Sequence, residues 1–316
     1  MEMPFVLKQA AERLISDGNA AKKDAQTISR RYRNEKTSAR TIVDAGEAAA
    51  YAVSRMPATF GAIAFVLRRL KEETGLAPET LTDVGAGTGA AVWAAQSLFD
   101  LKSALCLERE PAMRRIGERL TKAGENDFFT ASPEWRGFDL TDGGVEPADL
   151  VTAGYVLNEL PDETRETALL KLWAAARKAL VVVEPATPAC FDRMKAFRTL
   201  LIENGAFIAA PCPHQNACPD GWCHFACRVQ RSKLHRALKN GDAPFEDEKF
   251  TYLIATRERT AAPAARILRR PKIEKNKVVL TLCEPDGVRE RTVFKNEADY
   301  KAARKADWGD AFISNP

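Results

Sequence analysis

The sequence predicts an α/β protein with a doubly wound parallel sheet, preceded by helices and followed by a small β module. Strand-like and helix-like segments alternate from Leu81 to Pro185, a glycine-rich turn follows the first strand, and acidic residues stand at the ends of the next two. This alternation predicts parallel strands with crossover helices on both faces of the sheet. Ligands of such sheets bind at the carboxyl ends of the strands.

The composition predicts a globular protein, because 316 residues with 45% hydrophobic content suffice for one sizeable core and smaller modules. No apolar run approaches the roughly 18 to 20 residues that span a bilayer, and the first residues lack the order of a signal peptide. We therefore expect a cytoplasmic protein without membrane contact. Cytosolic thiols stay reduced, so clustered cysteines are expected to bind a metal instead of forming disulfides.

Residues 1–78 are expected to form an N-terminal helical domain. Apolar residues recur at helical spacing in residues 5–15, 39–53 and 59–70, and Pro57 separates the last two segments. The stretch ISRRYRNEKTSAR adds basic charge and one aromatic residue. It fits either an RNA-facing surface or an exposed helix end.

Residues 79–210 are expected to bind a cofactor, beginning with the turn Asp83-Val84-Gly85-Ala86-Gly87-Thr88-Gly89. Dinucleotide folds space their glycines as G-x-G-x-x-G, whereas these glycines alternate after an aspartate, which is typical of S-adenosylmethionine-dependent methyltransferases. Glu108, 25 residues after Asp83, is expected to hold the ribose hydroxyls. Asp139 is expected to meet the adenine amino group. Either acid alone would fit a helix cap or a surface position. The glycine turn and the two acids each stand at the end of a successive strand, and together they predict a Rossmann-like class I methyltransferase fold.

The segment after the fourth strand, YVLNELP at residues 155–161, should line the cofactor and methyl-transfer site. It contains neither the Asn/Asp-Pro-Pro-aromatic motif of amino-methylating nucleic-acid enzymes nor a cysteine nucleophile. Tyr155 is expected at the cofactor, and Tyr155 or Glu159 could orient or deprotonate a substrate. Cys190 is expected to be a packing residue. The catalytic residues therefore stay unassigned, and the fold is compatible with lost activity.

The stretch CPHQNACPDGWCHFAC at residues 212–227 holds four of the 7 cysteines and two of the 3 histidines. Such a concentration of soft ligands predicts a metal site. Zinc would take cysteines with His214 or His224, whereas an iron-sulfur cluster prefers four thiolates. The spacing does not separate these readings. Cys227, expected at the start of a helix, and the distant Cys283 compete as ligands.

Basic residues follow the cysteine-rich stretch: residues 228–277 contain fourteen Lys and Arg against six Asp and Glu, a local excess of +8 in a chain of net charge +4. This excess suits a phosphate-rich partner. A solvated surface helix would show the same charge.

Six segments carry a family resemblance: YAVSRMPATFGA, DVGAGTGAA, VTAGYVLNELP, VVVEPATPA, APCPHQNACPDGWCHFACRVQR and EKFTYLIATRE. With them the chain resembles, over about residues 40 to 310, the Rsm-type ribosomal small-subunit, methyltransferase-like family, which includes a mitochondrial methyltransferase-like protein. The resemblance implies S-adenosylmethionine binding, a four-iron, four-sulfur (4Fe-4S) cluster, and association with the small ribosomal subunit and its ribosomal RNA during assembly. The implied cluster ligands are Cys212, Cys218, Cys223 and Cys283.

The cluster would fix the basic helix beyond it for phosphate contacts, through Arg228, Arg231, Lys233, Arg236 and Lys239. Residues 211–260 would thus form an iron-sulfur insertion with a basic helix and the last strand of the sheet. Residues 261–316 predict a small β module with a terminal helix, either an RNA-binding barrel or a cap over the cluster.

Three functions remain open. The first is an assembly factor for the small ribosomal subunit, monomeric when off the ribosome. The second is an active methyltransferase of ribosomal RNA. The third is a small-molecule methyltransferase with structural zinc. The unassigned catalytic loop favours the first.

Overall fold

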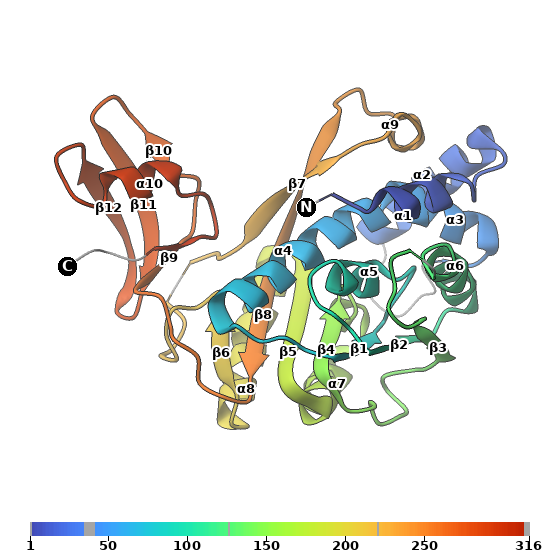
Figure 1. Ribbon diagram of the computed structural model, residues 1–316, viewed down its shortest axis with the longest axis horizontal. Coiled ribbons are helices and arrows are strands. Elements are labelled where there is room, and N and C mark those ends of the chain that lie inside the picture. The colour runs from blue at the N-terminus through green and yellow to red at the C-terminus, as the bar shows by residue number, and fades with distance from the viewer. Residues whose placement is uncertain (1, 35–41, 126, 220, 313–316) are drawn as a thin grey trace.

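The computed structural model describes residues 2–34, 42–125, 127–219 and 221–312. One mixed sheet of eight strands has the order β3-β2-β1-β4-β5-β8-β6, with β7 paired to β8 (Figure 1). Its strands are β1 (Thr80–Val84), β2 (Ser103–Glu108), β3 (Glu134–Gly137), β4 (Ala148–Gly154), β5 (Ala176–Pro185), β6 (Phe207–Ala210), β7 (Phe225–Gln230) and β8 (Phe245–Thr256).

Strands β1 to β5 pair in parallel, and β8 runs antiparallel between β5 and β6. A doubly wound sheet with one reversed strand between its last two members is the arrangement of class I methyltransferases. The expected α/β class and the doubly wound sheet of this fold are therefore confirmed. The turn after β1 lies next to the change of winding direction, where ligands of such sheets bind.

Helices cover both faces of the sheet, since α4, α5 and α6 pack on one face and α7 and α8 on the other (Figure 1). Their apolar residues recur every three or four positions, as in α6, where Ala112, Met113, Ile116 and Leu120 are buried. The bounds are α4 (Met56–Thr74), α5 (Ala90–Gln96), α6 (Pro111–Lys122), α7 (Asp162–Ala175) and α8 (Pro188–Glu203), with a short 3₁₀ turn η1 (Leu157–Glu159).

The N-terminal helices are α1 (Phe5–Glu12), α2 (Gly18–Asn34) and α3 (Ala45–Ser54). Asp44 caps α3 by accepting from the Glu47 N–H, so α3 begins after the start expected from periodicity. Their buried residues join those of the sheet in one continuous core. The N-terminal helices and the eight-stranded sheet with its covering helices thus form one unit, the methyltransferase-like body. Residues 35–40, the end of the basic stretch ISRRYRNEKTSAR, lie outside the described residues.

No single described helix is both long and apolar enough to cross a membrane. The pair α3 and α4, bent by 52°, passes the same test of length and composition. Both helices are largely buried inside the molecule.

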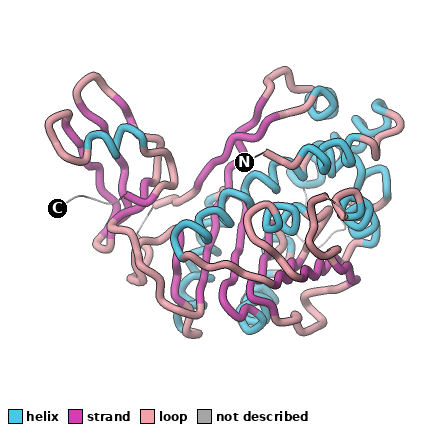
Figure 2. Tube along the Cα trace, in the orientation of Figure 1, coloured by secondary structure: helices cyan, strands magenta, loops and turns pink. Residues whose placement is uncertain are grey.

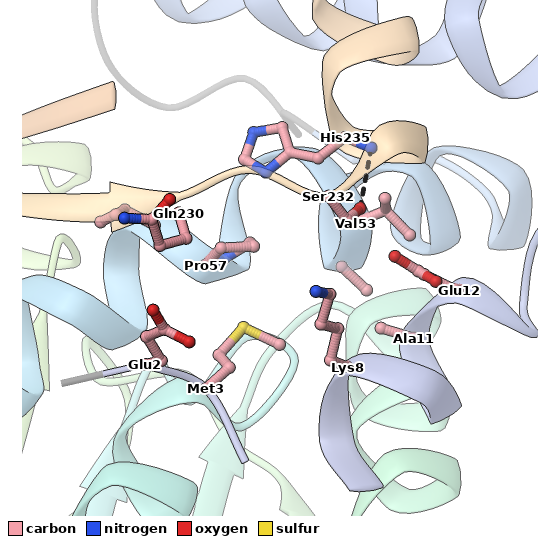
Figure 3. A pocket seen from close by; sticks show the side chains of 12 residues that line it. Glu2, Met3, Lys8, Ala11, Glu12, Val53, Pro57, Gln230, Ser232 and His235 are labelled. Carbon is pink, nitrogen blue, oxygen red and sulfur yellow. Dashed lines mark hydrogen bonds between the residues drawn. The ribbon is translucent and has the colours of Figure 1, made fainter. Parts of the chain in front are cut away.

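A long two-stranded arm formed by β7 and the first half of β8 projects from the sheet and ends in α9 (Lys233–Lys239), beside α2 (Figure 1). The expected helix from Cys227 is wrong over residues 225–230, which pair in register with residues 245–250. Phe225 and Val229 are buried while intervening positions are more exposed, which suits a strand. The helix begins only after Ser232, which accepts from the His235 N–H at 3.1 Å (Figure 3).

The C-terminal module has its own small core and consists of strands apart from one helix (Figure 2). Its elements are β9 (Ala265–Ile267), β10 (Lys272–Ile273), β11 (Lys277–Glu284), β12 (Gly287–Phe294), α10 (Tyr300–Lys305) and β13 (Ala311–Phe312). The expected hairpin is present, since β11 and β12 pair antiparallel across Pro285 and Asp286.

Candidate functional site

The glycine turn after β1 adopts a backbone that other residues rarely take. Gly85, Gly87 and Gly89 have φ of 68°, 58° and 92°. A Cβ at Gly85 would lie 2.6 Å from Val156 Cγ2. The Gly85 N–H donates to the Leu107 carbonyl at 2.9 Å, which fixes the turn against β2. Glycine is therefore required here for both conformation and space.

The acidic residues of the sequence motif surround this turn. Asp83 is buried, and its Oδ1 accepts from Thr152 Oγ1 at 2.6 Å. Glu108 accepts from the N–H groups of Gly87 and Glu110, both at 2.7 Å. Asp139 lies two residues after β3, where it accepts from the Thr141 N–H. The two strand-end acids thus flank the turn as the fold predicts.

One cavity of about 870 Å³, open to solvent, joins these groups. Of the expected cofactor residues, Gly85, Gly87, Glu108, Asp139 and Tyr155 line it. Ala86, Thr88 and Gly89 complete the turn behind them, and Thr88 and Asp83 are buried. Five of the expected cofactor residues therefore line the same cavity.

Among the cavity residues that sequence reasoning missed are two tyrosines, Tyr32 on α2 and Tyr51 on α3. They reach the cavity because α2 and α3 fold back over the carboxyl ends of the strands. Local periodicity carries no signal for that return.

The segment after β4 is held in an uncommon conformation. Tyr155 has a φ of 63°, in the left-handed region that side chains seldom adopt. Its hydroxyl donates to Glu248 Oε1 on β8 at 3.1 Å. Asn158 Nδ2 donates to Glu184 Oε2 at 2.6 Å, which ties the segment to the end of β5.

Glu159 lines the same cavity. Burial, with the nearby carboxylates Glu108 and Glu184, raises its pKa to about 7. A carboxyl group with this pKa can accept or release a proton near neutrality. Glu159 is the ionisable side chain best placed for acid-base chemistry in this loop.

A second cavity, of about 790 Å³, lies at the cysteine-rich loop. Cys212, Cys218, Cys223 and Cys283 all line it, and so does His214. Cys283 Sγ lies 3.7 Å from His214 Nε2. The four cysteines implied by the family resemblance, distant in sequence, are thus brought to one cavity.

The other cysteines lie elsewhere. Cys227 is on β7, with its sulfur against Gly61 of α4, and is not among the residues that line the cavity. Cys106 and Cys190 are buried in the protein core. Of the two competing thiols, the geometry favours Cys283.

The donor set fits a soft metal group. Burial, then the neighbouring Cys212 and Cys218, raise the pKa of the Cys283 thiol to about 12. Burial, then the neighbouring Cys212, Cys283 and Cys218, hold the pKa of Cys223 well above its usual range. These thiols need a cation to become thiolates at neutral pH, and a bound metal would supply it. Within the described part of the chain, no three His, Cys, Asp or Glu side chains are grouped as a site for one metal ion.

Arginines missed by sequence reasoning also line the cysteine cavity: Arg198 of α8, Arg266 of β9 and Arg269. Arg266 is fully buried and donates to the Pro211 carbonyl at 2.7 Å and to both carboxylate oxygens of Glu73. It thereby joins the C-terminal module to α4 and to the cysteine loop. For Arg198 a signal exists in the sequence, because it shares an apolar helical stripe with Met194 and Leu201.

Three of the five side chains expected to bind RNA are paired with acids of the opposite strand. Arg228 pairs with Asp247 at 2.9 Å, and Arg231 and Lys239 pair with Glu246 at 2.5 and 2.7 Å. Although burial opposes ionisation of Glu246, bonds from His235, Lys239 and Arg231 hold its pKa well below the usual range.

The other two residues of the expected RNA-binding set carry no such pair. Within the described ranges, no ion pair joins Lys233 or Arg236 to an acid, and Lys233 is exposed. Of the five side chains, these two have the most available charge.

The comparisons with known proteins agree with the motifs. The family model described as mitochondrial small ribosomal subunit Rsm22 matches residues 45–313. The human mitochondrial ribosome assembly protein METTL17 is 28% identical over 285 residues, covering 82% of this chain and 61% of the relative. A Schizosaccharomyces pombe protein, mitochondrial Rsm22-cox11 tandem protein 2, is 24% identical over 359 residues, covering 93% of this chain and 47% of the relative. The chain therefore spans about half to three fifths of these relatives.

Solved structures similar to this chain include methyltransferases. The magnesium protoporphyrin IX methyltransferase of Synechocystis PCC 6803 has a TM-score of 0.43 at 15% identity, covering 77% of this chain and 98% of that one. The ribosomal protein L11 methylase of Lactobacillus delbrueckii has a TM-score of 0.38 at 14% identity, covering 62% and 78%. The fold assignment rests on the strand order.

The expectation of a cytoplasmic protein is wrong, because the matching family and both relatives are mitochondrial by description, which points to mitochondria. An argument from apolar runs and signal-peptide order carries no information on mitochondrial targeting, so it could not separate the two compartments. The family expected from the motifs is confirmed, since the model covers most of the chain. The chain belongs to the mitochondrial small ribosomal subunit Rsm22 family.

Proposed function

We propose that this protein is a methyltransferase-like assembly factor of the small ribosomal subunit that binds S-adenosylmethionine, a 4Fe-4S cluster and ribosomal RNA. The observation that carries the proposal is the convergence of Cys212, Cys218, Cys223 and Cys283 on one cavity. The human relative is named a ribosome assembly protein, which supports the partner.

Two separate cavities support two bound groups. The first combines the glycine turn with Glu108 and Asp139, the constellation that suits a nucleoside cofactor. In the second, three thiols come from one loop and the fourth from β11. A cluster bound there would supply iron-sulfur bonds that cross-link the loop to the C-terminal module. It would act as a structural staple beside the basic arm.

The test of the cluster is the iron, sulfide and zinc content of anaerobically purified protein, with its absorption spectrum. We expect about four iron atoms per chain and a broad band near 400 nm. Colourless protein with about one zinc would contradict the cluster. Binding to the particle is tested by cosedimentation of the loaded protein with purified small subunits, and with large subunits as the control.

A second candidate function is methyl transfer to ribosomal RNA, favoured by the position of Glu159. This side chain lines the cofactor cavity with a pKa near 7. Transfer of a labelled methyl group from S-adenosylmethionine to small-subunit RNA, lost in Glu159→Gln with cofactor binding retained, would establish an enzyme. Labelling equal in both proteins would exclude Glu159 as the base.

A further inference from the structure

Arg198 is a buried cation next to the cysteine cavity. Its side chain lies on the apolar face of α8, and the residue is 3% exposed. Nε donates to Cys212 Sγ at 3.3 Å, and a terminal nitrogen donates to the His214 carbonyl at 2.8 Å. One side chain thus holds both a candidate ligand and the loop that follows it.

No carboxylate pairs with Arg198 among the residues that the structure describes. Arg266, the other buried arginine of the cavity, has Glu73 as its counter-charge. A buried guanidinium is costly unless an anion compensates it. The acceptor of Arg198 that can carry negative charge is Cys212, and only as a thiolate. Thiolate is also the form in which cysteine binds a metal.

Arg198 also connects the two sides of the cysteine set. By holding the His214 carbonyl, it fixes the loop segment whose His214 ring approaches Cys283 on β11. The path Cys212, Arg198, His214, Cys283 therefore spans the cavity from the loop to the C-terminal module.

We propose that Arg198 is the counter-charge and positioning residue of the cysteine site, and that it raises the reduction potential of the cluster held there. The inference rests on the cluster proposed above. One-electron reduction adds negative charge to the cluster and its sulfurs. A nearby positive charge and an N–H donor to a ligand sulfur stabilise that state, so both raise the potential.

The test compares Arg198→Gln and Arg198→Lys with the matched control Arg193→Gln in the full chain. Arg193 lies on the same helix and donates to Cys190 Sγ at 3.0 Å, but neither residue lines the cysteine cavity. Each protein is purified anaerobically, its iron is measured, and the cluster is titrated with dithionite while electron paramagnetic resonance follows its reduction. Circular dichroism reports the fold.

We expect Arg198→Gln to shift the midpoint potential to more negative values, Arg198→Lys to lie between it and wild type, and Arg193→Gln to match wild type. Loss of iron from Arg198→Gln with retention in Arg198→Lys would also support the proposal, because it shows that the charge is required. Equal potentials in wild type and Arg198→Gln would overturn it and leave the cluster standing. Failure of both Arg198 variants to load or fold would overturn it too, since Arg198 would then act through packing. Wild-type protein without iron would reject the cluster and this inference together.

Discussion

Arg266 and Glu73 form a two-pronged ion pair inside the protein, with N–O distances of 2.7 and 2.5 Å. One partner belongs to β9 of the C-terminal module and the other to α4 of the methyltransferase-like body. Because Arg266 also donates to the Pro211 carbonyl, the pair lies directly behind the cysteine loop. The C-terminal module and the methyltransferase-like body are thus joined where the candidate cluster ligands meet.

Replacing Glu73 by Gln should destabilise the protein by about 3 to 5 kcal/mol, since it leaves the buried Arg266 charge uncompensated. Denaturant unfolding of the two proteins measures the difference. The exposed pair between Lys102 and Glu79 provides the control, and Lys102→Ala should change stability little. Equal effects of the two substitutions would show that the buried pair does not hold the module.

Cys218→Ser should abolish iron binding, whereas Cys227→Ser should leave it intact. Cys218 lines the cysteine cavity, and Cys227 lies apart from it against α4. Iron and sulfide per chain in the two variants decide the matter. Retention of iron by Cys218→Ser, or its loss from Cys227→Ser, would refute this assignment of ligands.

Gly85→Ala should weaken S-adenosylmethionine binding at least about tenfold, because the new methyl group would overlap Val156 at 2.6 Å and displace the turn. Gly75→Ala is a matched control: both glycines have φ of 68°, but nothing lies within 4 Å of a Cβ at Gly75. Calorimetric titration with S-adenosylmethionine compares them. If both variants bind like wild type, the turn does not form the cofactor site.

Burial raises the pKa of Asp83 from 3.8 to about 7. The folded protein therefore binds this proton more tightly than the unfolded chain, and the resulting stability is complete below about pH 4. It is lost as the pH rises towards 7, by a few kcal/mol. Asp83→Asn should flatten the decrease in unfolding free energy across this window, measured by denaturant unfolding from pH 4 to 8. An unchanged pH profile would mean that Asp83 does not titrate there.

Lys233→Ala should reduce the salt dependence of RNA binding by about one unit in the slope of log K against log salt concentration. Arg228→Ala should change it less, since Asp247 already neutralises that guanidinium. Fluorescence anisotropy with a small-subunit RNA fragment over a salt series gives both slopes. A larger effect of Arg228 would place the RNA on the other side of the arm.

The location of the cysteine ligands divides sequence from structure most clearly. Their density in residues 212–227 indicates a metal site, but spacing alone leaves Cys227 and Cys283 as competitors. Cys283 reaches the cavity because β11 pairs with β9, where Arg266 stands opposite Cys283. Strand pairing brings together residues that are far apart in the sequence, and its register cannot be read from the pattern of neighbouring residues.

In the arm formed by β7, β8 and α9, the number of charges could be read from the sequence but their pairing could not. A count of charges favoured a phosphate-rich partner for this segment, yet residues 225–230 form a strand whose acidic partner supplies Glu246 and Asp247. The cap residue Ser232 could be read from the sequence, but Phe225 and Val229 lie four residues apart, a spacing that fits one face of a helix as well as one face of a strand. Net charge is additive along a chain, whereas the charge that a partner can contact depends on which acidic side chains lie opposite the basic ones.

The sequence alone determined the alternation of strands and helices from Leu81 to Pro185, the glycine turn, the acids beside it and the family, because periodicity, steric demands and motif spacing are local properties. Tertiary structure decided which thiols share a cavity, which cations are already paired, and that Tyr32 and Tyr51 reach the cofactor cavity. These outcomes depend on long-range packing, in which burial and strand register bring together residues that local chemistry leaves independent.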